Sequence, residues 1–215
     1  MALSKLTYNS LNVTPTASKG IGFDSGADDL STDFAGGAMT FISKFTSDGS
    51  DATATFASGI DSTYKEYLFI YNNIHPETDN TSFQVGFRDG STAYDATKTT
   101  TFFMAQHTEA DAYQFEYEGA HDIAQGTGFL ELARSVGSDN DQAVSGYLHL
   151  FNPSSTTFVT HFIARTQYAD SSGTTTSVNA FVAGYCNVTA AIDGVQFAMS
   201  SDEIQGGTIS LYGIN

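Results

Sequence analysis

Apolar and polar positions alternate over short stretches from residue 38 onward, and this spacing predicts β-strands. Around Phe69 the run from Tyr67 to Tyr71 is apolar at every position, so both faces of this strand are apolar. Such a pattern is typical of a central strand that is covered on each side. Pro76 is expected to end the strand because it has no amide donor for the ladder.

Turn residues separate the predicted strands at short intervals, and helix patterns are almost absent. The segment 119–142 breaks this rhythm, and its part 127–136 could form either a short helix or a long covering loop. We therefore predict an all-β fold, an antiparallel β-sandwich of the jelly-roll type, with about ten strands. The predicted strands are 38–45, 53–57, 64–74, 81–87, 99–107, 111–119, 143–151, 156–168, 176–186, 192–200 and 207–214.

Residues 1–37 differ from the rest of the chain, because they are rich in Ser, Thr, Gly and Asp and contain only isolated apolar residues. We interpret them as an extended N-terminal arm that becomes ordered against a partner or its own domain. The predicted head domain is then 38–215. The N-terminal stretch has no long apolar run, so we expect no secretory signal. No segment approaches the length of an apolar transmembrane helix.

The acidic charge balance limits the partners of this protein. Its 8 basic and 24 acidic residues give a net charge of −16, which repels phosphate backbones and anionic lipid surfaces. We therefore expect no nucleic-acid partner and no membrane partner. Divalent cations, a high-salt environment and a basic partner surface all suit this charge, and solubility alone also explains it.

The histidines provide one candidate metal site. His149 and His161 lie on strands that we expect to be adjacent, where they could meet across the ladder. Together with His107 or His121 they could bind a metal ion. We prefer the alternative that these are partly buried histidines hydrogen-bonded to their neighbours. The remaining histidine, His75, stands at the end of a strand and is not expected to be a ligand.

A pair of glutamates provides a candidate catalytic site. Glu116 and Glu118 alternate with aromatic residues on one predicted strand, so their carboxylates share a face. Glycoside hydrolysis requires such paired carboxylates. The chain has no Trp to form a sugar platform. A solvated strand face is therefore the preferred interpretation, and Glu131 and Glu203 have no identifiable partner.

The single cysteine, Cys186, excludes an intramolecular disulfide. It lies in an apolar, strand-like run, and we expect a buried, unreactive thiol rather than a nucleophile. The chain has no phosphate-binding loop, no serine-hydrolase elbow and no zinc-protease helix motif. We therefore assign no catalytic, cofactor-binding or metal-ligating residues.

Acidic turns leave calcium open as an alternative. The segments 24–29, 47–51, 88–91 and 137–142 carry oxygen ligands close to glycine. None has the spacing of the twelve-residue helix–loop–helix calcium loop, and turn chemistry alone explains their composition. Exposed Tyr, Asn, Asp and Gln on loops at one end of a sandwich would also suit a sugar-binding surface.

Three stretches of the head carry a resemblance to a known group of proteins. They are GIDSTYKEYLFIYNNIHPETDNTSFQVGF, SGYLHLFNPSSTTFVTHFIA and AIDGVQFAMSSDEIQGGTISLYGIN. Taken together they resemble virion structural proteins of tailed bacteriophages, in particular of phages that infect marine cyanobacteria. The resemblance covers 59–215.

This resemblance implies a β-sandwich head on an external part of the virion, of the tail-fibre, capsid-fibre or decoration type. It implies no catalytic residues. We expect a non-enzymatic homo-oligomer, most simply a trimer, that the N-terminal arm attaches to other virion proteins of the capsid or tail. One alternative is a carbohydrate-binding module that contacts host surface glycan. Another is a depolymerase that uses Glu116 or Glu118.

Overall fold

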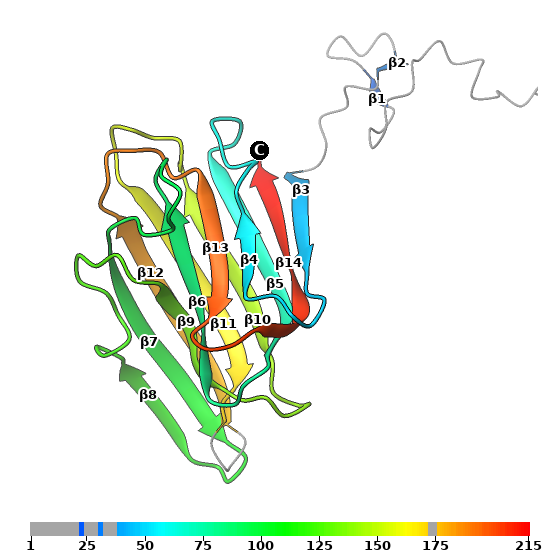
Figure 1. Ribbon diagram of the computed structural model, residues 1–215, viewed down its shortest axis with the longest axis vertical. Coiled ribbons are helices and arrows are strands. Elements are labelled where there is room, and N and C mark those ends of the chain that lie inside the picture. Colours follow the sequence, from blue (N-terminus) through cyan, green and yellow to red (C-terminus); the bar gives the residue numbers. More distant parts are fainter. Residues whose placement is uncertain (1–21, 24–29, 32–37, 172–175) are drawn as a thin grey trace, which may run out of the picture. The chain divides into compact units, whose positions relative to one another are not determined.

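A computed structural model of the chain describes residues 22–23, 30–31, 38–171 and 176–215 (Figure 1). All regular elements of the described residues are β-strands, so none of them forms a helix that could cross a bilayer. The chain divides into two units, Met1–Thr40 and Phe41–Asn215. In the first unit, β1 (Gly22–Phe23) pairs with β2 (Leu30–Ser31). The rest of the predicted arm lies outside the described residues.

The strands from β3 onward form two antiparallel sheets that pack face to face as a β-sandwich. This confirms the predicted fold class. One sheet has eight strands in the order β3 (Met39–Thr46), β14 (Ile204–Ile214), β5 (Glu66–Pro76), β10 (Val144–Phe151), β11 (Thr160–Ala169), β12 (Thr176–Cys186), β7 (Lys98–Thr108) and β8 (Tyr113–Tyr117). The other has four strands in the order β4 (Thr53–Phe56), β13 (Gly194–Met199), β6 (Thr81–Arg88) and β9 (Leu130–Val136).

Aromatic side chains fill the space between the sheets. Phe197 of β13 is fully buried and lies at the centre of this core. Its ring centroid is 5.5 Å from that of Phe69 on β5, 5.6 Å from that of Phe83 on β6 and 6.2 Å from that of Phe56 on β4. Edge-to-face and stacked pairs at these separations add to the free energy gained by burial. The alternating apolar positions of β4, β5, β6 and β13 therefore meet in one cluster.

A buried tyrosine fixes the contact between β5, β10 and β11. The hydroxyl of Tyr71 lies 2.6 Å from Oγ1 of Thr166, and both residues are fully buried. Gly146 of β10 lies beneath the Tyr71 ring, where an added Cβ would stand 2.8 Å from that ring. Burial raises the pKa of Tyr71 far above its usual range. The hydroxyl therefore remains a neutral hydrogen-bonding group.

The segment 127–136 forms neither the helix nor the covering loop that we predicted. From Leu130 onward it is the strand β9, with Leu130 and Leu132 fully buried. The apolar alternation at these two positions fits a strand, and pairing with β6 overrides the helix preference of the intervening Glu131. The preceding loop also contributes to the core edge, because Ile123 packs against the buried cluster.

The prediction for β5 is correct in position but wrong in one respect. Its inner positions Tyr67, Phe69 and Tyr71 are fully buried against the four-stranded sheet. Its other face, with Leu68 and Ile70, is not covered by another layer of the described part of the chain. Neighbouring side chains of the same sheet shield Leu68, so two apolar faces here do not mean two packed layers.

Candidate functional site

The eight-stranded sheet carries a broad surface on the side that faces away from the four-stranded sheet. We call this surface the outer face. Cross-strand partners in an antiparallel sheet share a face, so the register arranges its side chains in rows. The middle row contains, in sheet order, Ile70, Tyr147, Arg165, Phe181, Phe103 and Tyr117. The next row contains Tyr212, Leu68, His149, Ile163, Ala183 and Thr101.

Large apolar side chains on this face meet solvent. Ile163, at the centre of the sheet, is 51% exposed, and Phe115 of β8 is 72% exposed. Phe103 and Phe181 stack with ring centroids 5.0 Å apart, and the Arg165 guanidinium lies 5.0 Å from the Phe181 ring centre. The ring stacking and the cation–π contact both stabilise this arrangement of side chains on the sheet. The outer face is therefore a preformed apolar surface.

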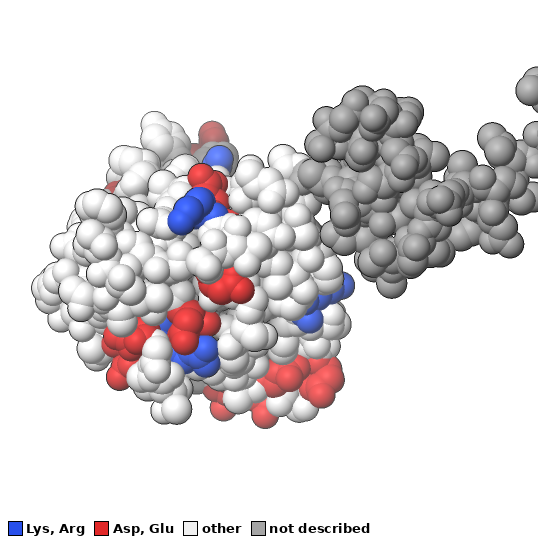
Figure 2. Space-filling model, turned by 90° about the horizontal axis from the view of Figure 1, so that it is seen from above, with Lys and Arg blue, Asp and Glu red and all other residues white. Residues whose placement is uncertain are grey.

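The outer face is also free of acidic side chains over its central part. None of the outward positions of β10, β11, β12 and β7 is Asp or Glu, although the chain has 24 acidic residues. The only charged residue there is Arg165, whose Nε donates a hydrogen bond to Asn179. Viewed from one end of the sandwich, charged groups elsewhere form small clusters with uncharged surface between them (Figure 2). These four strands thus add no acidic charge to the outer face, whereas on neighbouring β5 the carboxylate of Glu66 lies 4.0 Å from Nδ1 of His149.

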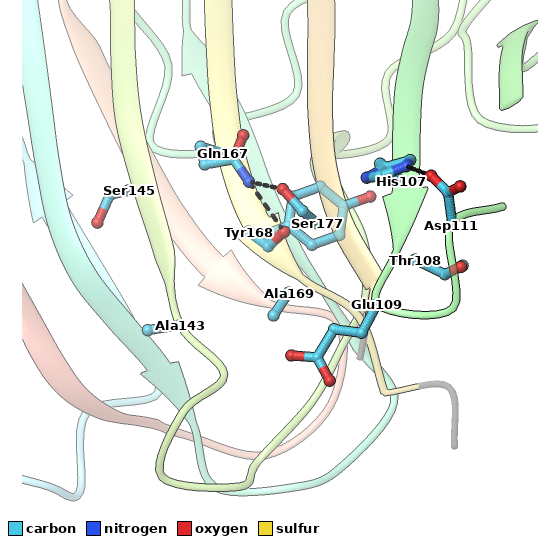
Figure 3. A pocket seen from close by; sticks show the side chains of 10 residues that line it. All are labelled: His107, Thr108, Glu109, Asp111, Ala143, Ser145, Gln167, Tyr168, Ala169 and Ser177. Atoms are coloured by element: carbon cyan, nitrogen blue, oxygen red, sulfur yellow. Dashed lines mark hydrogen bonds and ion pairs between the residues drawn. The ribbon is translucent and has the colours of Figure 1, made fainter. Parts of the chain in front are cut away.

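Two hollows lie at opposite ends of these strands. The first has a volume of about 590 Å³ and is lined by polar side chains of His107, Glu109, Asp111, Ser145, Gln167 and Ser177. Figure 3 shows the hydrogen bond from Gln167 to Ser177 and, on the side of β7, the His107–Asp111 pair. The second has a volume of about 470 Å³ and is lined mainly by apolar groups around Phe151, Ile163 and Tyr185.

The predicted metal histidines do not come together. β10 and β11 are adjacent, as expected, but His149 lies opposite Ile163, and His161 lies opposite Phe151. His107 is at the far end of β7, where it pairs with Asp111. In the described ranges, no three His, Cys, Asp or Glu side chains are placed to hold a metal ion together.

The two glutamates of the catalytic hypothesis lie around an arginine. Glu118 is 2.9 Å and Glu116 is 3.8 Å from Nη2 of Arg134 on β9. Glu131, for which the sequence indicated no partner, lies 2.7 Å from Nδ1 of His121. Burial raises the pKa of Glu118, and the hydrogen bond with Glu116 acts in the same direction. Arg134 therefore lies between the glutamates as a shared ion-pair partner.

Replacing Glu118 by Gln is expected to change the pH dependence of stability. A carboxyl with a raised pKa in the folded state loses stabilising free energy as pH rises through the interval between its unfolded and folded pKa values. The variant should therefore gain stability relative to wild type between about pH 4 and about pH 7. Urea unfolding at both pH values would measure this. Glu77→Gln, at an exposed position, is the control, and an equal change in both variants would contradict the expectation.

The thiol of Cys186 is buried, as predicted, and burial raises its pKa to about 12. It therefore stays protonated at neutral pH and is a poor nucleophile. Its cross-strand partner Lys98 is also buried, which lowers the pKa of the ammonium. Lys98 donates a hydrogen bond of 2.7 Å to the carbonyl of Gly128. This lysine ties the loop before β9 to β7, a role that the sequence did not reveal.

The acidic turns in the described residues use their oxygens locally. In the turn 47–51, a carboxylate oxygen of Asp48 accepts hydrogen bonds from Ser50, which lower the pKa of Asp48, and Asp51 accepts one from the Asp48 amide. Arg88 of the turn 88–91 pairs with Asp193 at 2.8 Å. The segment 24–29 lies outside the described residues. Turn chemistry accounts for the contacts within 47–51, whereas the Arg88–Asp193 pair joins two segments that are distant in sequence.

His75 lies near the end of β5, and Glu203 immediately precedes β14. The Nε2 atom of His75 lies 3.1 Å from the carbonyl oxygen of Asp139. The carbonyl of Glu203 accepts a hydrogen bond from the amide of Glu77. The first contact links β5 to the segment between β9 and β10, and the second links the residue after β5 to the residue before β14.

Comparison of this chain with protein-family models, with curated proteins and with solved structures found no match. Its own geometry therefore carries the functional argument. The outer face was not predicted from the sequence, although one signal for it was present. The apolar second face of β5, with the phenylalanines of β12 and β8, indicated a side of the sheet that prefers contact with another surface.

Proposed function

We propose that this protein is a non-enzymatic structural protein of a tailed-phage virion, displayed as a decoration, fibre or spike subunit and attached by its N-terminal arm. The sequence resemblance supports this assignment. Its three stretches include β5, β10 and β14, and these strands are neighbours in the eight-stranded sheet. The resemblance therefore covers a contiguous part of the fold.

The observation that carries the proposal is the uncovered apolar outer face. Soluble monomers rarely expose continuous apolar patches of more than a few hundred Å². The exposed Ile163, Phe115 and Tyr117 belong to one sheet surface. A surface of this kind favours a protein that works within an assembly over one that acts alone on a small substrate.

Mass spectrometry of purified particles of the phage that encodes this chain tests the proposal. We expect the chain in stoichiometric amounts, and cryo-electron microscopy should then place its β-sandwich on the capsid or the tail. Deletion of 1–37 should remove it from the particle, whereas Thr53→Asp, an exposed change on the opposite sheet, should not. Particles that lack the wild-type chain would refute the virion assignment.

The polar hollow beside His107 favours a second candidate function, adhesion to a host surface glycan. Its hydroxyl, amide and carboxyl groups are the hydrogen-bonding groups that recognise sugars, and it lies at one end of the strands. A glycan array, probed with and without calcium, would test this. Binding that Gln167→Ala abolishes would support the hollow as the site, and no binding under either condition would exclude adhesion by this route.

A further inference from the structure

The outer face has the composition of a protein–protein interface. Aromatic residues and arginine are enriched at interface cores, whereas Asp, Glu and Lys are depleted there. The middle of this face contains Tyr147, Phe181, Phe103 and Arg165 and no acidic or lysine side chain. Polar residues such as Gln167 and Ser177 lie toward one end of the strands, where an interface has its rim.

We propose that the outer face binds a second copy of this chain. The net charge of −16 opposes contact between two copies over most of the surface. The acid-free centre of the outer face is where two copies can approach without placing carboxylates against each other. A self-complementary patch of this kind is what a two-fold association between identical chains requires.

The size of the face fits this occupant. β11 has 10 residues, which corresponds to a length of about 33 Å at about 3.3 Å per residue. The five neighbouring strands from β5 to β7 span about 24 Å at about 4.8 Å per strand. The resulting area of about 800 Å² equals the area that each partner contributes to a standard-size interface.

The chemistry of the centre favours a protein partner over a carbohydrate. Ile163 presents an aliphatic side chain beside Ala183 and Thr101 of the same row. Phe103 and Phe181 stack on each other, so each ring gives one of its faces to its neighbour. A sugar-binding site needs a flat, open aromatic face with hydrogen-bonding groups beside it. The two stacked rings do not offer such a face at these two positions of the described sheet.

This self-association would serve the proposed structural role, which rests on the same face, and it can be tested without any virion. The full-length chain should form an oligomer in dilute solution, with a mass that is a multiple of 22.9 kDa. Multi-angle light scattering and sedimentation equilibrium measure this mass. Ile163→Asp should raise the dissociation constant of the oligomer roughly 100- to 1,000-fold, because each copy would bury an unpaired carboxylate.

Matched variants keep the test decisive. Thr53→Asp places the same charge on an exposed strand position of the four-stranded sheet and should leave the oligomer intact. Thr101→Asp, at an exposed outward position in the row of Ile163, should act like Ile163→Asp and serves as the second variant if Ile163→Asp fails to fold by circular dichroism. Folding of each variant is verified before its mass is compared.

A monomeric wild type, or folded Ile163→Asp and Thr101→Asp variants that keep the wild-type mass, would overturn the proposal. A monomer retained on polysaccharide through this face would make it a glycan site instead. An oligomer dispersed by these variants would support self-association even if the chain were missing from virions. The proposed function and the interface can therefore fail separately.

Discussion

Phe197→Ala is expected to lower the free energy of unfolding by about 3–5 kcal/mol, the range for truncating a large aromatic residue in a packed core. The Phe197 side chain is fully buried between the sheets. Its ring contacts those of Phe56, Phe69, Tyr71 and Phe83, which come from three different strands. These rings belong to both sheets, so neither sheet can move in to fill the cavity without losing its own pairing.

The control for this prediction is Phe158→Ala. Phe158 is 72% exposed and lies in the loop between β10 and β11. The same atoms are removed there, but the free energy of unfolding is expected to change by no more than about 0.5 kcal/mol. Urea denaturation followed by circular dichroism gives both values. Similar losses for the two variants would contradict the position of Phe197 at the centre of the core.

Gly146→Ala is expected to cost about 3 kcal/mol, the upper end of the usual range for overpacking. A Cβ at Gly146 would stand 2.2 Å from the carbonyl oxygen of Arg165 and 2.8 Å from the Tyr71 ring. The carbonyl belongs to the backbone of β11, and the hydrogen bond with the Thr166 hydroxyl holds the Tyr71 ring in place. Neither group can retreat alone, so β10 would have to separate from β5 or β11.

Gly128→Ala is the matched control because no atom lies within 4 Å of its added Cβ. There the lower entropy of the unfolded chain should leave stability unchanged or raise it by up to about 1 kcal/mol. Thermal unfolding of both variants measures the difference. A Gly146→Ala protein as stable as the Gly128→Ala protein would show that the close contact at Gly146 relaxes freely.

The strands were predictable where one periodic pattern dominated. Phe83, Val85 and Phe87 alternate with polar or small residues in the sequence, and all three are buried on β6. β9 was missed because Glu131 and Arg134 are good helix formers, and only pairing with β6 decides in favour of a strand. Local preference and long-range pairing disagree there, and the pairing partner is far away in sequence.

The outer face was not predictable as a site because its parts are distant in sequence. Ile70, Arg165 and Phe181 become neighbours in one row only through the strand order of the eight-stranded sheet. Histidine and carboxylate patterns in the sequence do not point to this face, whose distinctive feature is a shared absence of acids across four strands. Such an absence becomes visible only when the register is known.

The position of β14 affects how the protein is made. β14 lies between β3 and β5 in the eight-stranded sheet, although both of these strands leave the ribosome long before it does. A nascent chain that lacks residues 204–214 therefore presents β5 with an open edge, and β3 has no neighbour within that sheet. Because open strand edges template pairing with other chains, prematurely terminated products are expected to aggregate or be degraded. Synthesis of β14 thus supplies the ladder partner that β3 and one edge of β5 lack until the end of the chain is made.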